Sequence, residues 1–277
     1  MNTVFQRLLL ATEHTEFDVG AETVALALAR QCRLPLAGVL PLVSNPEYEA
    51  LAPEIAARTE QAASAKIAQL RDSAQAHGVE LDLRARRGPE PYHEILDEAR
   101  ERGSDLIVIR RRGQRGFLAN LLLGEMVTKV VAHAPCSVLI VPRGARMWQS
   151  RVLVAAEPTE YGQQLIARAA AVAAECALPL HIVSVIAHDE PALRQQTEAF
   201  IDRALQALRH SGLSVQGQTR VGTPYQEILT AIQRDAADLL VIGSRGDRRI
   251  QRSLIGGVAQ KVIGLAECPV LVVPSTT

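Results

Sequence analysis

The chain has 277 residues, of which 48% are hydrophobic and 22% charged, and its formal net charge is zero. This balance is ordinary for a globular protein and argues against a general nucleic-acid-binding or membrane-surface role, because both roles favour a basic surplus. No apolar run approaches the roughly 18 residues that a membrane-spanning helix needs. The first residues, MNTVFQRLLLATEHTE, lack the small-residue cleavage site of a signal peptide, so we expect a cytoplasmic protein.

In chain order, the first half alternates apolar, strand-like runs with helical patterns. One helix is expected to begin near Pro91, because proline is favoured in the first turn of a helix. A further helix is expected just before the last strand. The expected strands are 8–12, 36–43, 79–85, 105–109 and 137–141, and the long helical patterns are 21–32 and 54–77.

The second half repeats this order. RLLLATEHTE, from Arg7, matches RVLVAAEPTE, from Arg151, and SDLIVIR matches ADLLVIG, so that Asp105 corresponds to Asp238. The offset falls from 144 to 133 residues because the first copy carries about eleven extra residues near VSNPEYEALAPEIAAR. Several matched blocks in one order indicate an internal duplication. The second copy's expected strands are 152–156, 180–186, 214–220, 238–242 and 270–273, with helices at 163–176, at 191–210, from Pro224 and before the last strand.

Alternating strands and helices predict a parallel sheet covered by helices on both faces. We therefore expect an α/β protein with two tandem, doubly wound, five-stranded, Rossmann-like domains, at residues 1–144 and 150–277, joined by RGARMWQSR. Ligands of such sheets bind beyond the carboxyl ends of the strands.

The fourth strand of each copy leads into a glycine-containing loop. In the second copy Gly243 and Gly246 precede Gly256 and Gly257, and GGVAQKV opens a helix. One interpretation is a phosphate cradle, because glycine lets the backbone approach an anion and helix N–H groups point at it. The other is a plain turn in which glycine only permits a positive φ. Neither copy has GxGxxG after its first strand or GxxxxGK[ST], which argues against an ordinary dinucleotide site and a P-loop NTPase.

Two copies of about 140 residues, the Gly-x2-Gly-x9-Gly spacing and an acidic residue after strand one resemble the universal stress protein family, over essentially the whole chain. In its ATP-binding members the loop ends in Gly-Ser/Thr, an aspartate after strand one binds the ribose, and a residue late in strand two meets the adenine. The resemblance implies ATP, with or without Mg²⁺, in the second domain only. The nucleotide-binding residues that it implies are Ala155, Ala156, Glu157, Val185, Ile242, Gly243, Arg245, Gly246, Gly256, Gly257 and Val258.

Two departures from the family pattern affect this assignment. Gly257 stands where the family has serine or threonine, which removes a hydroxyl contact, and Glu157 stands where it has aspartate. A backbone N–H and a carboxylate remain at these positions, so we expect the second copy to bind an adenine nucleotide.

The first copy departs further, and we expect it not to hold ATP in the family's manner. A carboxylate at a helix N-terminus suits the helix dipole but would repel a phosphate there. The differences are Arg110 for Gly243, Glu125 for Gly257, Pro41 for Val185, Glu13 for the family's aspartate, and one additional residue between Gly113 and Gly124.

Seven arginines end the third strand or follow the fourth strand of the first copy, at the sheet edge where ligands bind. They could hold an anionic ligand or an acidic partner surface. Alternatively, they are solvated and balanced by acids such as Glu90, Glu94 and Glu125. The seven are Arg84, Arg86, Arg87, Arg110, Arg111, Arg112 and Arg115.

The sequence does not suggest an enzyme. It has no HExxH or GxSxG motif and no histidine pair at metal-ligand spacing, so we expect no metal site. Slow ATP hydrolysis, or autophosphorylation of Ser244 or Ser253, is the enzymatic alternative. His14, beside Glu13, is interpreted as a surface-turn residue. The cysteines, Cys32, Cys136, Cys176 and Cys268, lack CxxC spacing and are expected to be buried thiols.

Two functions are compatible with these patterns. In the first, a cytoplasmic stress-response module binds ATP in its second domain, and an unidentified protein partner reads its state. In the second, the chain is a stress-linked scaffold that binds no nucleotide, or a binder of another small molecule. The fifth strands, CSVLIVP and CPVLVVP, are apolar, and the resemblance implies that they pair in an internal pseudo-dimer, which could itself form a homodimer.

Overall fold

The structure of the chain is a computed structural model, and it describes residues 3–13, 18–44, 47, 51, 53–111, 124–244 and 255–275. Their contacts divide into two compact units. The N-terminal unit contains described residues within 5–111 and 125–147, and the C-terminal unit contains those within 148–275 together with residues 3, 4 and 124. The single tryptophan, Trp148, belongs to the C-terminal unit, where it is 4% exposed and its Nε1–H donates to the sulfur of Cys176 at 3.3 Å.

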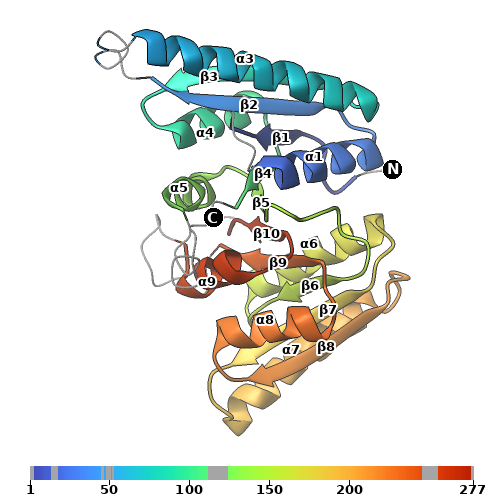
Figure 1. The fold of residues 1–277 in the computed structure, drawn as a ribbon. Helices are drawn as coiled ribbons and strands as arrows, with labels where there is room; N and C mark the ends of the chain where they lie inside the picture. Colours follow the sequence, from blue (N-terminus) through green and yellow to red (C-terminus); the bar gives the residue numbers. More distant parts are fainter. Residues whose placement is uncertain are drawn as a thin grey trace. The chain divides into compact units, whose positions relative to one another are not determined.

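The N-terminal unit is built on a parallel sheet with the strand order β3-β2-β1-β4-β5 (Figure 1). Helix α1 contacts β1, β2, β4 and β5, helix α3 contacts β3, and helix α4 packs against α5, β2 and β3. Right-handed connections place α1 and α3 on one face of the sheet and α4 and α5 on the other. In chain order the elements are β1 (Leu8–Ala11), α1 (Val19–Cys32), β2 (Leu36–Val43), α3 (Pro53–Ala76), β3 (Leu81–Gly88), α4 (Pro91–Glu101), β4 (Leu106–Arg110), α5 (Glu125–His133) and β5 (Ser137–Val141).

The C-terminal unit repeats this arrangement, with the strand order β10-β9-β6-β7-β8 and all pairs parallel. Helices α6 and α7 contact each other, as do α8 and α9. The elements are β6 (Val152–Ala155), α6 (Glu160–Glu175), β7 (Leu180–Ile186), α7 (Pro191–Leu208), β8 (Val215–Val221), α8 (Pro224–Arg234), β9 (Leu239–Gly243), α9 (Gly257–Leu265) and β10 (Val270–Val273).

Strands β1 and β10 are entirely apolar, and β4 and β5 are apolar except for Arg110 and Ser137, because helices cover both faces of each sheet. Every residue of β1, β4, β5 and β10 is buried. Strands buried on both faces show continuous apolar runs rather than alternation, which is why these segments are recognisable in the sequence. The predicted α/β fold with two tandem, doubly wound, five-stranded sheets is confirmed.

The aspartates matched by the repeat are structural. In the N-terminal unit, the Asp105 carboxylate accepts hydrogen bonds from the backbone N–H groups of Gln6 and Arg7, at 2.7 and 3.0 Å. In the C-terminal unit, Asp238 accepts from the successive N–H groups of residues 149–151, at 2.6, 2.8 and 2.9 Å. Each carboxylate therefore holds the segment that enters the neighbouring first strand, at the end of the sheet opposite to the glycine loop.

The pairing of the fifth strands in a pseudo-dimer stays a prediction, as does any homodimer. Within the part of the chain that the structure describes, no helix is both long and apolar enough to cross a lipid bilayer.

Candidate functional site

The carboxyl edge of the C-terminal sheet brings the predicted ribose and adenine residues to adjacent strands. Ala155 ends β6, and the N–H of Ala156 donates to a β7 carbonyl at 3.0 Å, so the chain stays beside β7 as it leaves the sheet. Glu157 follows and is exposed. Val185, next to the end of β7, is half-buried, and Ile242 is buried in β9. A carboxylate and an apolar side chain thus reach the surface at one edge.

Hydrogen bonds close the base of the second glycine loop. Gly243 ends β9, and the N–H of the next residue, Ser244, donates to the Val273 carbonyl at the end of β10, at 3.1 Å. The Ser244 carbonyl accepts the N–H of Gly256 at 3.0 Å. The two ends of the loop are therefore joined directly. Arg245 and Gly246 lie between them, outside the described residues.

The far end of the loop opens helix α9. Gly256 is its N-cap residue and Gly257 its first residue, and Val258 is 39% exposed. Among the described residues, no atom would lie within 4 Å of a Cβ added at Gly257, so the described structure leaves the first turn open on that side. N–H groups in the first turn of a helix have no carbonyl partner within it, and together with the helix dipole they favour an anion.

The described glycines of this loop do not need a positive φ. Gly256 has a φ of −60°, and neither Gly243 nor Gly257 is among the residues with positive φ. Interpreting the loop as a turn that needs glycine for φ alone is therefore wrong at these three positions. At Gly243 the reason is close packing, because an added Cβ would lie 2.6 Å from Cε1 of Tyr161.

The matching edge of the N-terminal sheet is filled by a buried charge cluster. Arg110, which ends β4 where Gly243 ends β9, is 6% exposed. Its Nη2 donates to Glu13 Oε2 at 2.5 Å, and its Nε lies 2.7 Å from Asp18 Oδ1. Asp18 is fully buried and also accepts the Glu13 N–H at 2.6 Å. An arginine and two acids thus occupy the position of the open glycine edge.

The cluster continues into α1 and α3. The Thr12 hydroxyl donates to Glu22 Oε1 at 2.7 Å and lies 3.3 Å from Asp18 Oδ2. Glu22 pairs with Lys66 of α3, whose Nζ is 2.8 Å from Oε1 and 3.0 Å from Oε2, and both residues are 8% exposed. The side chains of this charge cluster are Thr12, Glu13, Asp18, Glu22, Lys66 and Arg110.

Two matched positions differ together between the copies. At the offset of 144 residues, Asp18 corresponds to Gly162 of α6, just as Arg110 corresponds to Gly243. A Cβ at Gly162 would lie 1.9 Å from the Glu157 carbonyl oxygen, so the C-terminal unit has no room for a side chain there. In the N-terminal unit α1 begins only after Asp18, which makes room for the carboxylate. An oppositely charged pair thus stands in one unit where two glycines stand in the other.

The charge cluster favours a proton on Asp18. Its three carboxylates, Glu13, Asp18 and Glu22, outnumber the two cations, Arg110 and Lys66. Burial raises the pKa of Asp18 from 3.8 to about 6, although Arg110 and the Glu13 N–H oppose the shift. Protonation of this carboxyl would bring the cluster to neutrality.

We expect the Asp18 carboxyl to make the N-terminal unit less stable as the pH rises from about 4 to about 6. In this range the folded state holds a proton on Asp18 that the unfolded state has lost, and the contribution amounts to roughly 3 kcal/mol. The carboxyl carbon-13 shift of Asp18 should titrate with a midpoint near 6. The Asp18→Asn variant lacks this carboxyl and therefore lacks this loss. Between pH 4 and pH 7 its free energy of unfolding should rise relative to that of the natural chain. A midpoint at or below the ordinary value would contradict this prediction.

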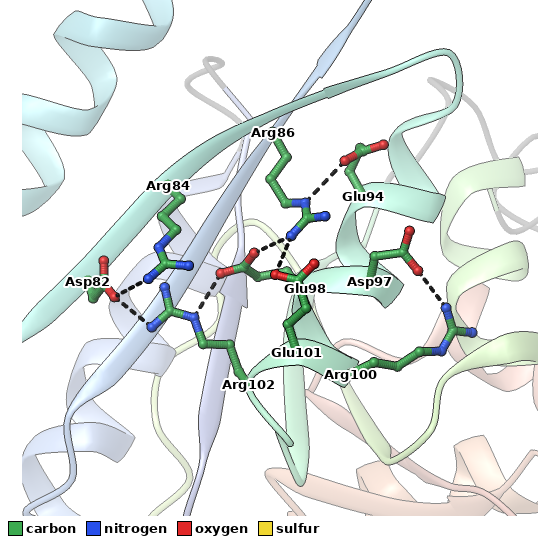
Figure 2. Close-up of polar contacts among 9 residues, drawn as sticks. All are labelled: Asp82, Arg84, Arg86, Glu94, Asp97, Glu98, Arg100, Glu101 and Arg102. Atoms are coloured by element: carbon green, nitrogen blue, oxygen red, sulfur yellow. Dashed lines mark hydrogen bonds and ion pairs between the residues drawn. The ribbon is translucent and has the colours of Figure 1, made fainter.

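The predicted anion-binding arginines are largely paired with acids in the N-terminal unit. Figure 2 shows Arg86, on β3, reaching three carboxylates of α4 at 2.8 to 3.1 Å. Arg84 pairs with Asp82 at 3.4 Å, and Arg87 pairs with Glu60. Arg112 and Arg115 lie outside the described residues. The three carboxylates that bind Arg86 are Glu94, Glu98 and Glu101.

This network fastens the edge strand β3 to α4. Glu98 is fully buried and also accepts from Arg102, which in turn bonds Asp82 at 2.6 Å (Figure 2). The C-terminal unit repeats one of these pairs, because Arg220 Nε lies 2.7 Å from Glu227 Oε2. The balanced-charge interpretation is therefore confirmed for Arg86 and Glu94. For Glu90 and Glu125 it stays untested, because Arg112 and Arg115 lie outside the described residues; both acids pair with Lys129 at 3.0 Å.

Some groups that could carry metal or acid–base chemistry lie in the described part of the chain. The described histidines, cysteines and carboxylates include no group of three or more that could hold a metal ion. His181 Nδ1 lies 2.6 Å from Asp235 Oδ2, and burial lowers the pKa of this histidine. This pair sits near the start of β7, at the sheet end away from the loop. His14 and Ser253 lie outside the described residues.

The four cysteines, all in the described part of the chain, are free thiols, but the expectation that all four are buried is wrong for three of them. Only Cys268 is fully buried, whereas Cys32, Cys136 and Cys176 are half-buried. Burial raises the pKa of the Cys136 thiol to about 12, which keeps it protonated and unreactive.

Sequence reasoning missed Tyr161 and most of the charge cluster. Asp18 was detectable, because it stands opposite Gly162 in the repeat. Lys66 also left a signal, since it lies in the buried stripe of α3 with Ala63, Leu70 and Ala74. A lysine in an apolar helical stripe indicates a buried partner.

Comparison with known proteins supports the duplication. A sequence model described as the universal stress protein family matches residues 5–142 and again residues 149–274. The universal stress protein Slr1230 of Synechocystis is 26% identical over 167 residues, which cover 60% of this chain and 57% of that protein. The chain thus spans little more than half the length of that relative. The universal stress protein Mb2346c of Mycobacterium bovis is 22% identical over 246 residues and 82% of each chain.

Solved structures with the same fold cover nearly the whole chain. A universal stress protein from Archaeoglobus fulgidus has a TM-score of 0.76 at 19% identity and covers 98% of this chain and 97% of its own. A structure from Pseudomonas aeruginosa described as a putative universal stress protein has a TM-score of 0.75, also at 19% identity, and covers 98% and 93%. At this identity the likeness shows the fold.

Proposed function

The chain belongs to the universal stress protein family, and from this premise we propose that its C-terminal domain binds an adenine nucleotide whereas its N-terminal domain does not. The observation that carries the proposal is the difference between the two sheet edges. In one, Gly243 leads into a loop that ends at an open helix N-terminus. In the other, buried Arg110 is bound to Glu13 and Asp18.

Each part of the C-terminal edge has a role in the proposed site. The N–H groups at Gly257 and Val258 would face the phosphates, helped by the dipole of α9. The exposed Glu157 carboxylate would accept hydrogen bonds from ribose hydroxyls. The half-buried Val185 would contact the adenine ring.

Mg²⁺ would come bound to the ATP phosphates. Among the described residues no cluster of histidine, cysteine and carboxylate side chains offers it a site of its own. This fits the ion's habit of keeping waters and using substrate phosphates as ligands.

We propose a binding module rather than an enzyme, because the described histidines, cysteines and carboxylates include no group of three or more that could hold a catalytic metal ion, and the sequence has no motif of a known catalytic site. Its bound or empty state would be read by a protein partner in the cytoplasm. The fifth strands would pair within the chain, as the sequence predicts.

The proposal predicts that a negative charge in the second loop weakens nucleotide binding strongly and that the same charge in the first loop does not. We expect isothermal titration with MgATP to show at least tenfold weaker binding for Gly246→Asp, because the carboxylate repels the phosphates. Gly113→Asp is the matched control and should bind within twofold of the natural chain. Equal weakening by both substitutions, or no binding by the natural chain at millimolar ATP, would contradict the proposal.

A further inference from the structure

Tyr161 connects the first turn of α6 to both strands that border the second loop. The residue is the second of α6, and its hydroxyl donates to the Val273 carbonyl of β10 at 2.5 Å. Its ring lies against Gly243 at the end of β9, where an added Cβ would be 2.6 to 3.0 Å from three of its atoms. Only glycine therefore fits at Gly243 with the tyrosine in this place.

The carbonyl that binds Tyr161 also holds the loop. Val273 O accepts the N–H of Ser244 at 3.1 Å, and Ser244 O accepts the N–H of Gly256 at 3.0 Å. A continuous chain of hydrogen bonds thus runs from the tyrosine hydroxyl through Val273 and Ser244 to Gly256, the residue that caps α9. Ser244 is 6% exposed, which protects this chain from water.

The N-terminal unit keeps the strand contact but cannot keep the tyrosine contact. Its Arg111 N–H donates to the Val141 carbonyl at 2.7 Å, which matches the bond between Ser244 and Val273. The position that corresponds to Tyr161 is Phe17, which has no hydroxyl, and Gly243 is replaced by Arg110. The tyrosine and the glycine that admits it thus occur together in the unit whose loop we propose to bind nucleotide, and neither occurs in the other.

We propose that Tyr161 is a positioning residue that holds the base of the second loop in its binding geometry. The role of Gly243 would then be to admit the tyrosine ring rather than to approach a phosphate. Loop ends that are fixed before binding lose less conformational freedom when a ligand binds, so the ligand binds more tightly. The claim that Tyr161 increases the affinity for nucleotide rests on the proposed function. The claim that Tyr161 fixes the base of the loop does not.

Tyr161→Phe tests the proposal because it removes the hydroxyl and keeps the ring. The loop sequence contains Arg245, Arg248, Arg249 and Arg252, so the rate of tryptic cleavage at these arginines reports how firmly the loop's base is held. We expect loop cleavage, followed by mass spectrometry of the fragments, to become about fivefold faster, the factor typical of one lost hydrogen bond. MgATP should bind about fivefold more weakly. Gly243→Ala, which pushes the ring away, should change both in the same direction.

Two controls separate positioning from general stability. Tyr225→Phe alters another tyrosine of the C-terminal unit, which lies under Lys261 Nζ at 4.7 Å, and should leave loop cleavage unchanged. Trp148 fluorescence follows unfolding of the same unit. Loop cleavage that rises only in step with the Trp148 unfolding transition, or that is unchanged in Tyr161→Phe, would overturn the proposal. Faster cleavage with no ATP binding by the natural chain would uphold the holding of the loop and reject the nucleotide function.

Discussion

Replacing Arg110 by methionine should lower the free energy of unfolding of the N-terminal unit by about 3–5 kcal/mol, the usual effect of removing one partner from a buried ion pair. The substitution leaves Asp18, which is 0% exposed, without its cation, and Glu13 loses a bond of 2.5 Å. Urea unfolding, monitored by circular dichroism, measures this decrease in the free energy of unfolding. Trp148 fluorescence, which reports the C-terminal unit, should keep its midpoint.

Arg84→Met is the matched control for this experiment. Arg84 also ion-pairs with an aspartate, at 3.4 Å, but both side chains are more than half exposed. Exposed pairs contribute about 0–1 kcal/mol, so the control should change stability by less than about 1 kcal/mol. Similar losses for Arg84→Met and Arg110→Met would show that the charge cluster is not the support of this edge.

Gly162→Ala should destabilise the C-terminal unit by about 2–4 kcal/mol, through overpacking against backbone. This sign is opposite to the usual one, because alanine in place of a helical glycine normally gains about 1 kcal/mol. The added Cβ would lie 1.9 Å from the Glu157 carbonyl oxygen and 3.2 Å from the Phe200 ring. Urea unfolding, monitored through Trp148 fluorescence, measures the change in the free energy of unfolding of the C-terminal unit.

The matched substitution is Gly257→Ala, in the first turn of α9. Its Cβ would meet nothing within 4 Å, so the stability should change by less than about 1 kcal/mol. A stable Gly162→Ala variant would mean that the start of α6 can move. In that case the edge could accept an acid as the N-terminal unit does, and the contrast between the two edges would lose its physical basis.

The strands could be predicted from the sequence because burial on both faces makes them continuous apolar runs, and four of the predicted ranges match the structure's bounds, at β2, β5, β7 and β10. The end of β3 could not be predicted. It extends to Gly88 through three arginines because it pairs with β2 along its full length, up to Val43. Hydrogen bonding to a neighbour, rather than apolar content, sets this boundary.

Local capping explains another difference. Helix α6 begins at Glu160, three residues before the predicted start, because the Thr159 hydroxyl accepts the Gly162 N–H at 3.0 Å. This N-cap adds a turn that carries Tyr161 to the loop. The hydrophobic pattern of the helix does not include this polar turn, so the pattern could not predict where the helix starts.

The candidate site was predictable only in part. The glycine spacing and the departure at Arg110 are visible in the sequence, but the partners of Arg110 are not. Glu13 precedes it by 97 residues, and Lys66 reaches Glu22 across 44. Such partners become neighbours only when strands and helices pack. The sequence also pointed to an arginine-lined anion site, whereas packing pairs Arg86 with acids of α4.

Native mass spectrometry of the full chain, with and without MgATP, tests the central claim most directly, because it counts nucleotides per chain. We predict one nucleotide per chain, lost in Gly246→Asp and kept in Gly113→Asp. Two per chain would show that the Arg110 cluster does not close the N-terminal edge. None at millimolar ATP would contradict nucleotide binding and favour a scaffold.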